Sequence, residues 1–407
     1  MDTFTARRAE AAATTRAARA LPAWAYEHAN LQRLEIERVL LPSWQIVCHV
    51  NTIPRPGDYA TLDFGRESVF AVRDRDGRIR AYHNACRHRG ARLLDGTGRC
   101  PGPVTCPYHG WSYRTDGSLL AIPSAETFPG VERATLGLVE ARVEIALGFV
   151  FVALRGDLPP VAAAWAPFLE ELAPYRIEEM VPLGPITEES WDADWKVAMD
   201  NYLESYHVPI GHPGLNRMFT PDYTDQRHAP GIARGIGHLR PQESPRWAER
   251  VYQRNVARIV TDLPEDYRRS WRFYSALPNL GIDLFPEQMD FFQIIPRGPG
   301  RCTIRGGSFG RVDDRRGMRP LRYLGARLNA AVNAEDRALC ARVQRGLQSG
   351  GYRPGPLSRL ECWMVEFHDL LESRIPEIRD AAPPAVFAGA PGRSPDASFR
   401  SPDSPSR

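Results

Sequence analysis

The sequence predicts a two-domain protein of the α+β class, in which an all-β domain comes first and a domain of mixed strands and helices follows. Between about residues 43 and 155, short apolar runs rich in β-branched and aromatic residues alternate with tight turns. Between about residues 182 and 382, the periods of strands and helices mix, which is typical of α+β domains. A chain of 407 residues is long enough for both domains to bury a core.

The elements of the first half follow in order. Residues 1–24 are rich in arginine and alanine and poor in acids, and we expect residues 1–42 to form an arm with a loose helix rather than an export signal. Within residues 43–155 we expect strands in the runs SWQIVCHV, ESVFAVRD, RIRAYHNA and GFVFVALR. The Asp-Gly dipeptides at 76–77 and 116–117 are hairpin turn signals between such runs.

The second half begins with a linker. Residues 156–181 are rich in proline and alanine and lead into a short helix, after which residues 182–382 are expected to form the second domain. Residues 383–407 consist largely of proline, serine, alanine and arginine. Such a segment buries too little apolar surface to offset the entropy of ordering, so we predict a disordered tail.

Composition and charge exclude several classes of protein. The net charge of +3 is too small to indicate nucleic-acid binding. No apolar run approaches the roughly 18 residues that a membrane helix needs, so no membrane partner is expected. Seven cysteines, an odd number spread along a chain whose start fits no export signal, argue against a disulfide framework. We therefore expect a reducing cytoplasm and interpret clustered cysteines as metal ligands first.

Two short loops of the all-β domain each carry one cysteine and one histidine. The run CRHRG places Cys86 beside His88, and the run CPYHGW places Cys106 beside His109. A zinc finger normally pairs cysteine with cysteine and histidine with histidine along the chain. Two hairpin tips that face each other can instead give both thiolates to one iron and both imidazoles to the other, as in a Rieske [2Fe–2S] centre. A zinc site with the same four ligands is the alternative.

Residues beside these ligands also favour a cluster. Gly90 and Gly110 lack a Cβ, which lets main-chain N–H groups approach the bridging sulfurs closely. We expect Trp111 and Tyr113 to shield the cluster, with the Tyr113 hydroxyl as a hydrogen-bond donor to a sulfur.

The segment NYLESYHVPIGHP carries a second metal signal. We predict a helix over residues 194–207 that is ended by Pro209, because the residue before a proline is pushed toward extended geometry. On a continuous helix a five-residue spacing would turn His207 and His212 about 140° apart. The break lets the chain curl back, so that both imidazoles can meet at a single metal ion. The same helix would place Asn201 near the face that carries His207.

A ferrous site that activates oxygen needs one carboxylate beside two histidines, the facial triad. The best candidate is Asp336, which shares a predicted helical stripe with Cys340 and Val343 and so faces the core. A buried carboxylate needs a partner, and a metal ion is a suitable one. Two alternatives stay open: Asp336 as a helix-capping residue together with Asn333, and Glu335 as the ligand.

The two loops and the later segment, in this order, resemble the oxygenase (α) component of the Rieske non-haem iron oxygenases, the ring-hydroxylating family. The resemblance covers roughly residues 25–380. It implies a Rieske domain followed by a catalytic domain with an antiparallel sheet and helices, of the helix-grip or START-like kind. It also implies a [2Fe–2S] cluster, a mononuclear Fe(II) and O2 as co-substrate. The family's ligand aspartate precedes a glutamine at a spacing that Asp336 and Gln344 match.

The resemblance gives Glu204 a role between the two metal sites. In the family, the acid three residues before the first histidine links the two centres across subunits, which here would join His207 to His109 of a neighbouring chain. Aspartate is commoner there, so the glutamate is a departure; an exposed helical carboxylate is the alternative. A head-to-tail homotrimer is implied. We also expect catalytic roles for Asn201 and Tyr206.

The resemblance further implies that a separate flavin reductase supplies electrons, directly or through a ferredoxin. NAD(P)H would act only through that reductase. The leading hypothesis is a terminal oxygenase that hydroxylates or oxidatively dealkylates a small organic substrate. Aromatic-ring cis-dihydroxylation is the alternative within the class, and an electron-transfer protein without oxygenase activity is the alternative outside it.

The identity of the substrate is less constrained. Glu at the position of Glu204 is frequent in members that act on quaternary ammonium compounds, whereas Val208 departs from the cysteine associated with choline- and betaine-type motifs. An aromatic pocket could hold an arene by stacking or a trimethylammonium group by cation–π contact. We expect more than half of the aromatic residues of the segment 270–298 to be core: Trp271, Phe273, Tyr274, Phe285, Phe291 and Phe292.

Overall fold

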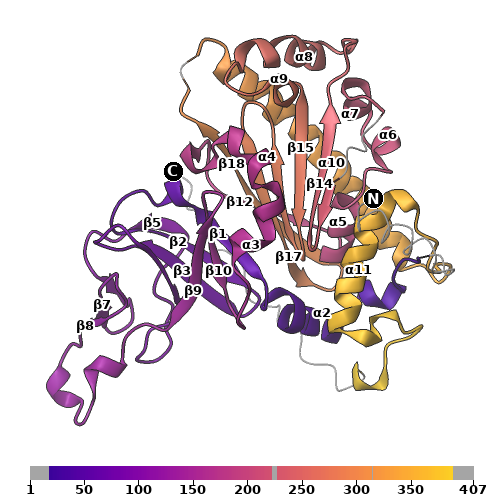
Figure 1. Cartoon of the computed structure of the whole chain (residues 1–407). Helices are drawn as coiled ribbons and strands as arrows, with labels where there is room; N and C mark the ends of the chain where they lie inside the picture. The colour runs from indigo at the N-terminus through magenta and orange to yellow at the C-terminus, as the bar shows by residue number, and fades with distance from the viewer. Residues whose placement is uncertain (1–17, 222–226, 314, 388–407) are drawn as a thin grey trace, which may run out of the picture.

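The structure, a computed structural model, describes residues 18–221, 227–313 and 315–387. Figure 1 shows two lobes, a smaller one built of strands and a larger one in which helices surround a sheet. The predictions for residues 1–17 of the arm and 388–407 of the tail lie outside the described residues. Within the described part of the chain the predicted α+β class is confirmed, with the all-β domain first.

The β domain contains a seven-stranded antiparallel sheet in the order β1-β10-β9-β4-β3-β2-β5, and a small three-stranded sheet β6-β7-β8. Both predicted Asp-Gly turns are present: Gly77 lies between β3 and β4 with φ of 81°, and Gly117 lies between β7 and β8 with φ of 86°. Positive φ is the reason why glycine is favoured in these hairpins. The strands are β1 (Trp44–His49), β2 (Asp58–Phe64), β3 (Glu67–Arg73), β4 (Ile79–His83), β5 (Thr97–Arg99), β6 (Val104–Thr105), β7 (Ser112–Tyr113), β8 (Leu119–Ala121), β9 (Glu140–Ala146) and β10 (Phe149–Ala153).

The second domain is built on an eight-stranded antiparallel sheet in the order β11-β18-β17-β16-β15-β14-β13, with β12 also paired to β18. The long helix α10 (Met318–Leu347) packs against α5 (Trp195–Tyr202) and α8 (Trp247–Ile259) beside this sheet (Figure 1). A long helix held across an antiparallel sheet is the arrangement expected for this domain. The strands are β11 (Met180–Pro182), β12 (Thr187–Trp191), β13 (Arg227–Ala229), β14 (Ile232–His238), β15 (Ser270–Ala276), β16 (Leu280–Leu284), β17 (Met289–Gly298) and β18 (Arg301–Arg311).

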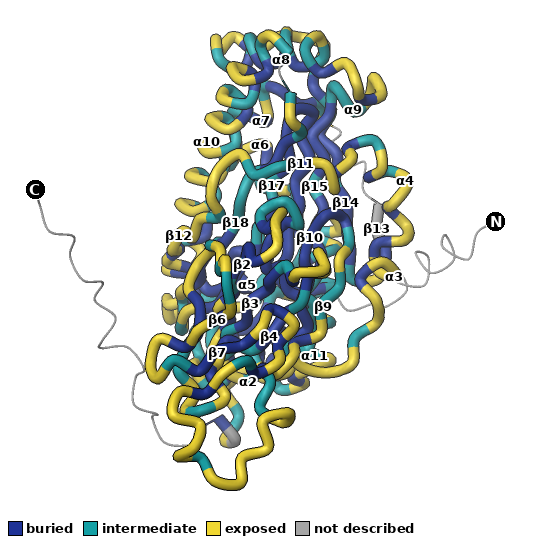
Figure 2. The backbone as a smooth tube through the Cα atoms, turned by 90° about the vertical axis from the view of Figure 1, so that its left-hand side faces the viewer, coloured by how far each residue is buried: buried dark blue, intermediate teal, exposed yellow. Residues whose placement is uncertain are grey.

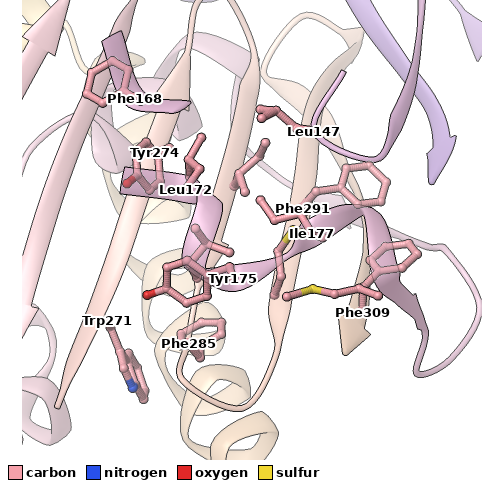
Figure 3. Close-up of a cluster of buried hydrophobic side chains, with 14 of the residues drawn as sticks. Leu147, Phe168, Leu172, Tyr175, Ile177, Trp271, Tyr274, Phe285, Phe291 and Phe309 are labelled. Carbon is pink, nitrogen blue, oxygen red and sulfur yellow. The ribbon is translucent and has the colours of Figure 1, made fainter. Parts of the chain in front are cut away.

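The segment predicted as a linker, 156–181, contributes to the core. It forms the short helices α3 (Val161–Trp165) and α4 (Leu169–Leu172) and several 3-10 turns. Its side chains Phe168 and Tyr175 are fully or almost fully buried, and Figure 3 shows them among aromatic residues of the second sheet. Each short helix or turn of this segment buries at least one apolar residue. The segment is therefore part of the second domain rather than a linker without contacts.

The described end of the N-terminal arm is tied to the second domain by a buried group of charges. Glu35 ends α2 (Ala29–Glu35), and its carboxylate contacts Lys196 Nζ at 2.8 Å; Asp194 contacts the same ammonium at 2.6 Å. Phe387, within the predicted tail, is 4% exposed and packs near Trp24, so the prediction of disorder is wrong for this residue. Figure 2 shows buried residues along the strands of both sheets and exposed residues on the outer sides of the helices.

Candidate metal centres

Two loops of the β domain share one backbone pattern. In each loop the cysteine N–H donates to the carbonyl of the fifth residue after it, at 2.8 Å for Cys86 and 2.7 Å for Cys106. The glycine four residues after each cysteine donates back to the cysteine carbonyl, and Gly90 and Gly110 have φ of 73° and 72°. A non-glycine residue rarely adopts this conformation. Each glycine therefore closes a tight loop that presents one cysteine together with one histidine.

The four predicted cluster ligands differ in burial. Cys86 and Cys106 are buried, whereas His88 is half-buried and His109 is exposed. The two imidazole rings lie 4.8 Å apart between centroids, and the buried Nδ1 of His88 has no hydrogen-bond partner in the described residues. Two buried thiols and two adjacent imidazoles nearer the surface form the donor set that a Rieske cluster takes. The residues present therefore fit such a cluster.

Trp111 and Tyr113 flank this group. The Trp111 indole stacks on the His88 ring with 5.0 Å between centroids and 6° between planes. The Tyr113 hydroxyl lies 3.2 Å from Cys86 Sγ and accepts the main-chain N–H of Arg87 at 3.0 Å. Because this oxygen already accepts one hydrogen bond, its own proton is available to the sulfur. Burial, and then the contact with Cys86, raises the pKa of Tyr113 above its usual range, so the hydroxyl keeps that proton.

The segment before the second site departs from the predicted helix. Helix α5 ends at Tyr202 rather than at His207, and a separate short helix, α6 (Val208–Gly211), follows after a turn. The prediction that Pro209 ends a helix is wrong. Pro209 lies in the first turn of α6, where the missing N–H has no helical carbonyl to lose. The turn between the two helices, rather than a broken helix, lets His207 approach His212.

The structure brings the three predicted iron ligands together. His207 Nε2 and His212 Nε2 are 3.0 Å apart, and Asp336 Oδ1 lies 3.6 Å from the first and 3.0 Å from the second. One donor atom from each of the three residues lies within 4.8 Å of the others. Asp336 comes from the middle of α10. The capping alternative with Asn333 is therefore wrong, because the helix begins at Met318 and an interior residue cannot cap its start.

Two glutamates hold the outer nitrogens of the imidazoles. Glu204 Oε1 lies 2.5 Å from His207 Nδ1, and Glu335 Oε2 lies 2.9 Å from His212 Nδ1. A histidine whose Nδ1–H donates to a carboxylate offers its Nε2 lone pair on the opposite side of the ring. Both Nε2 lone pairs thus point into the space between the two rings, which Asp336 Oδ1 also faces. Glu335, the alternative ligand, lies behind the His212 ring and outside the group of three.

This group fits a divalent cation. Asp336 Oδ1 is buried and faces the Nε2 atoms of the two imidazoles, at 3.6 Å from His207 and 3.0 Å from His212. Burial lowers the pKa of His207, but the carboxylates of Asp336 and Glu204 outweigh it and raise that pKa to about 9. Burial raises the pKa of Asp336, and the two imidazoles bring it below its ordinary value. Protons on the imidazoles thus balance the Asp336 carboxylate as a cation would. Two histidines with one carboxylate are the donor set of non-haem Fe(II).

A cavity of about 860 Å³ adjoins this group, between α5, α10 and the sheet. Its wall includes His207, His212 and Asp336, and also Asn201 and Glu204 among the predicted catalytic residues. The metal group is therefore placed where a small organic molecule has room to lie beside it.

The structure places two of the predicted residues away from the cavity and the core. Tyr206 is 60% exposed and does not line the cavity, because the turn after α5 carries it to the surface. Val343 is 51% exposed, whereas Cys340 and Gln344 are buried. The buried face of α10 is centred on those two residues, so Val343 lies past its edge while Asp336 lies just within it.

Several polar residues of the cavity were missed by the sequence analysis, and three of them form one group. Asp283 on β16 and Asp290 on β17 line it, and Tyr202 at the end of α5 donates its hydroxyl proton to Asp283 Oδ1 at 2.7 Å. The sequence does carry a signal for the two acids, because both stand among apolar residues in LGIDLFPEQMDFFQII. Acids at such positions of a strand face the same side as core residues and need a reason to be buried.

The aromatic residues divide between core and cavity. Four of the six residues named above belong to the buried core, in agreement with the expectation that more than half would: Trp271, Tyr274, Phe285 and Phe291. Phe273, Phe291 and Phe292 line the cavity, so Phe291 does both.

Comparisons with known proteins agree with these two centres. Residues 43–135 match the family model of the Rieske [2Fe-2S] domain, and residues 175–377 match that of the ring hydroxylating alpha subunit (catalytic domain). The glycine betaine monooxygenase oxygenase subunit of Chromohalobacter salexigens is 28% identical over 393 residues, which cover 90% of this chain and 88% of that protein. The chloroplastic choline monooxygenase of Spinacia oleracea is 27% identical, over 82% of this chain and 74% of that protein.

A solved structure shows the same fold. The structure of a quaternary ammonium Rieske monooxygenase superposes with a TM-score of 0.76 and 23% sequence identity, covering 89% of this chain and 97% of that one. Among the described residues, no helix has both the length and the apolar character needed to cross a membrane.

The two matched domains occur in one chain, in this order, and the second of them contains the group of two histidines and one aspartate. The zinc alternative is thereby wrong, as is the alternative of an electron carrier without oxygenase activity. Proteins of this kind use O2 and electrons from a reductase or ferredoxin to oxidise a small organic substrate. The chain belongs to the Rieske non-haem iron oxygenases, as an oxygenase component with a [2Fe–2S] cluster and a mononuclear iron.

Proposed function

We propose that this oxygenase oxidises an N-methylated or quaternary ammonium compound, by hydroxylation or by oxidative removal of an N-methyl group. One observation carries the proposal: the cavity beside the metal group is lined by aromatic rings and by two carboxylates, Asp283 and Asp290, that form no ion pair with a cation among the described residues, Arg319 and Arg322 of the same wall included. Such a wall favours a positively charged organic group over a neutral or anionic one. The activities named for the relatives, on glycine betaine and choline, support the same substrate class.

The proposal assigns the ligands residue by residue. Cys86 and Cys106 would bind one iron of the cluster, and His88 and His109 the other; burial of the thiols beneath the imidazoles supports this division. The cluster delivers electrons one at a time, and the mononuclear iron supplies the O2 chemistry.

His207, His212 and Asp336 would hold the mononuclear iron. Glu204 and Glu335 keep the Nδ1 protons on the two imidazoles, so that each Nε2 is directed at the metal position. These three residues would occupy one face of the iron, as in a facial triad, and the adjoining cavity offers room for substrate and O2. The phenylalanine rings of the wall exclude water from the same space.

The chain is proposed to act as a head-to-tail homotrimer in which Glu204 connects His207 to His109 of the next subunit. His109 is exposed, as a residue that meets a partner must be before assembly. Close to His207 in the sequence, the apolar side chains Tyr206 and Ile210 are exposed, at 60% and 88%, and a neighbouring β domain could cover them. Inter-subunit electron transfer is described for the quaternary ammonium Rieske monooxygenase whose structure superposes on this one.

Electrons are proposed to come from a flavin reductase, directly or through a ferredoxin, so that NAD(P)H is never bound by this chain. The proposed compartment is the cytoplasm, where the thiols that bind the cluster stay reduced.

Product analysis tests the substrate class. The loaded enzyme, with a reductase and labelled O2, is given a panel of N-methylated amines, quaternary ammonium compounds and arenes. Oxidation of an N-methyl carbon releases formaldehyde, with one oxygen atom in that product or in the hydroxylated substrate and the other in water. Turnover of the ammonium compounds supports the proposal. A cis-diol from an arene, without turnover of any ammonium compound, would replace it with aromatic-ring dihydroxylation, for which Phe273, Phe291 and Phe292 would provide the stacking wall.

A further inference from the structure

Two carboxylates face each other across neighbouring strands inside the cavity. Asp283 on β16 is the direct register partner of Asp290 on β17, and both side chains line the cavity. Like charges placed directly opposite each other in an antiparallel pair destabilise a sheet. Asp283 is only 8% exposed, so water does little to screen this pair. Two opposed acids at a buried position therefore require a compensating positive charge or a proton.

Arg319 and Arg322 also line the cavity, but among the described residues neither of them pairs with these two acids; Arg322 donates instead to the Glu287 and Arg311 carbonyls. Asp290 accepts hydrogen bonds from neutral amides, Gln288 Nε2 at 3.0 Å and Asn329 Nδ2 at 2.8 Å. Asp283 Oδ1 accepts the Tyr202 hydroxyl proton at 2.7 Å, while its Oδ2 has no hydrogen-bond partner in the described part of the chain. Neither acid forms an ion pair with any described arginine, lysine or histidine, although most buried carboxylates elsewhere in this chain do.

Without a bound cation, protonation reduces the negative charge of the two acids. Burial raises the pKa of Asp283 to about 8; Tyr202 lowers it in part, and Asp290 and Asp336 raise it further. Burial likewise raises the pKa of Asp290 above its ordinary value. At neutral pH the pair thus carries less than its full two negative charges. A single positive group that enters between the acids can displace a proton and restore the ionised form.

Aromatic rings stand next to the two acids. The Tyr202 ring meets the Phe292 ring edge-on, with 4.7 Å between centroids and 84° between planes. Phe292 can lie flat on the sheet because Gly281 and Gly306 lack side chains: a Cβ on Gly281 would come within 2.2 Å of the Phe292 ring, and one on Gly306 within 2.5 Å of a main-chain oxygen. Rings held in this way beside carboxylates suit an alkylated ammonium group, which binds aromatic faces but donates no strong hydrogen bond.

We propose that Asp283 and Asp290, together with Tyr202 and Phe292, form a subsite for one ammonium group of the substrate, and that these two acids set the selectivity for positive charge. The inference rests on the proposed function and adds to it the residues that recognise the charge. The metal group lies on the same cavity wall, so a substrate held here presents neighbouring carbon atoms to it.

Equilibrium binding with matched ligands tests the subsite. Choline and its uncharged carbon analogue 3,3-dimethyl-1-butanol have nearly the same shape and differ in the charge of one atom. We expect the loaded wild-type enzyme to bind choline more tightly than the analogue, measured by anaerobic calorimetry. Asp283→Asn and Asp290→Asn should each weaken choline binding by about tenfold or more, as for the loss of one buried counter-charge, and leave analogue binding unchanged or stronger.

A control variant separates charge recognition from general damage. Glu287 is also a buried carboxylate beside a tyrosine, with Tyr252 as its donor at 2.9 Å, but it lies outside this cavity. Glu287→Gln should bind choline as the wild type does, and thermal unfolding with the cluster's visible spectrum checks that each variant is folded.

The outcomes distinguish this inference from the proposed function. If N-methylated substrates are oxidised but choline binds equally to wild type and both Asn variants, the acid pair is not the subsite, although the function stands. If wild type binds the analogue as well as choline and oxidises only arenes, both are overturned.

Discussion

Glu335 Oε2 lies 2.9 Å from His212 Nδ1, while the next residue of α10, Asp336, contacts Nε2 of the same imidazole at 3.0 Å. One turn of a long helix thus holds both nitrogens of a proposed iron ligand. The orientation of the ring depends on where α10 lies, and α10 is itself fixed through Gln344, whose side-chain oxygen accepts the main-chain N–H of Asp194 at 2.8 Å. The metal position is therefore coupled to the packing of α10 against the start of α5.

The first prediction concerns this outer contact. Glu335→Gln keeps the shape of the side chain but replaces the anionic acceptor of the His212 Nδ1 proton with a neutral one. Iron affinity at the mononuclear site should fall by roughly tenfold to a hundredfold, the usual effect of losing such a partner. Iron retained after dialysis against a chelator measures this, with the cluster's absorbance as internal reference. Glu372→Gln on α11 (Cys362–Arg374), where Glu372 pairs with Arg379, is the matched control and should retain iron as the wild type does.

The second prediction separates the two metal centres. Asp336→Ala should lose the mononuclear iron and keep the Rieske chromophore, because Asp336 and the cluster loops belong to different domains. Anaerobically purified wild type should contain about three irons and two acid-labile sulfides per chain, from one cluster and one mononuclear site. The variant should contain about two of each. Full iron content with normal turnover in this variant would mean that another acid, with Glu335 the first candidate, is the ligand.

The third prediction concerns Glu204. Its Oε1 lies 2.5 Å from His207 Nδ1 and its Oε2 accepts the main-chain N–H of the same residue at 3.0 Å, but each oxygen has a further lone pair for a neighbouring subunit. Glu204→Gln should keep both metals while slowing the arrival of electrons at the active iron. Single-turnover experiments with a pre-reduced cluster measure that rate. Transfer as fast as in wild type would remove the bridging role and leave Glu204 with the orientation of His207 alone.

The candidate metal-binding residues could be found in the sequence because ligand chemistry is local. Cys86 and His88 stand in one short loop, and His207 and His212 lie five residues apart, so composition and spacing carry most of the information. Their local structure was less predictable: Pro209 was expected to end a helix, yet it begins one, since a proline is tolerated in a first turn as well as after a last one.

The polar part of the cavity wall, in contrast, depends on tertiary structure. Asp283 and Asp290 become a pair only through the register of β16 on β17, and Tyr202 reaches Asp283 only through the packing of α5 beside the sheet. No spacing rule along the chain encodes contacts of this kind. The exposure of Tyr206 has the same origin, because one residue more or less in a turn decides which side chains face the cavity.

The fourth prediction concerns the cluster. Tyr113→Phe removes the hydroxyl that lies 3.2 Å from Cys86 Sγ. Without this hydrogen bond the more negative, reduced cluster is less stabilised, so its reduction potential should fall. A redox titration followed by electron paramagnetic resonance measures the shift. Tyr59→Phe, on β2 of the same domain, removes a hydroxyl that contacts only the Asp95 carbonyl at 3.4 Å and should leave the potential unchanged. An equal shift in both variants would point to loosened packing of the domain instead.

The fifth prediction follows from the pKa of Asp283, which is raised to about 8 chiefly by burial. A permanently charged ammonium ligand binds best when this carboxyl is ionised, so below pH 8 its binding must release a proton. Choline affinity should therefore rise as the pH increases toward 8, with a limiting slope of roughly tenfold per pH unit for one proton released, and level off above it. Calorimetry of the iron-loaded enzyme in buffers of different ionisation enthalpy measures both the affinity and the proton release. Asp283→Asn should remove the pH dependence of choline affinity. The affinity for the uncharged analogue should not change with pH in either protein. A wild-type affinity that falls with rising pH over this range has the wrong sign for a displaced carboxyl proton, and would require that choline binds away from Asp283.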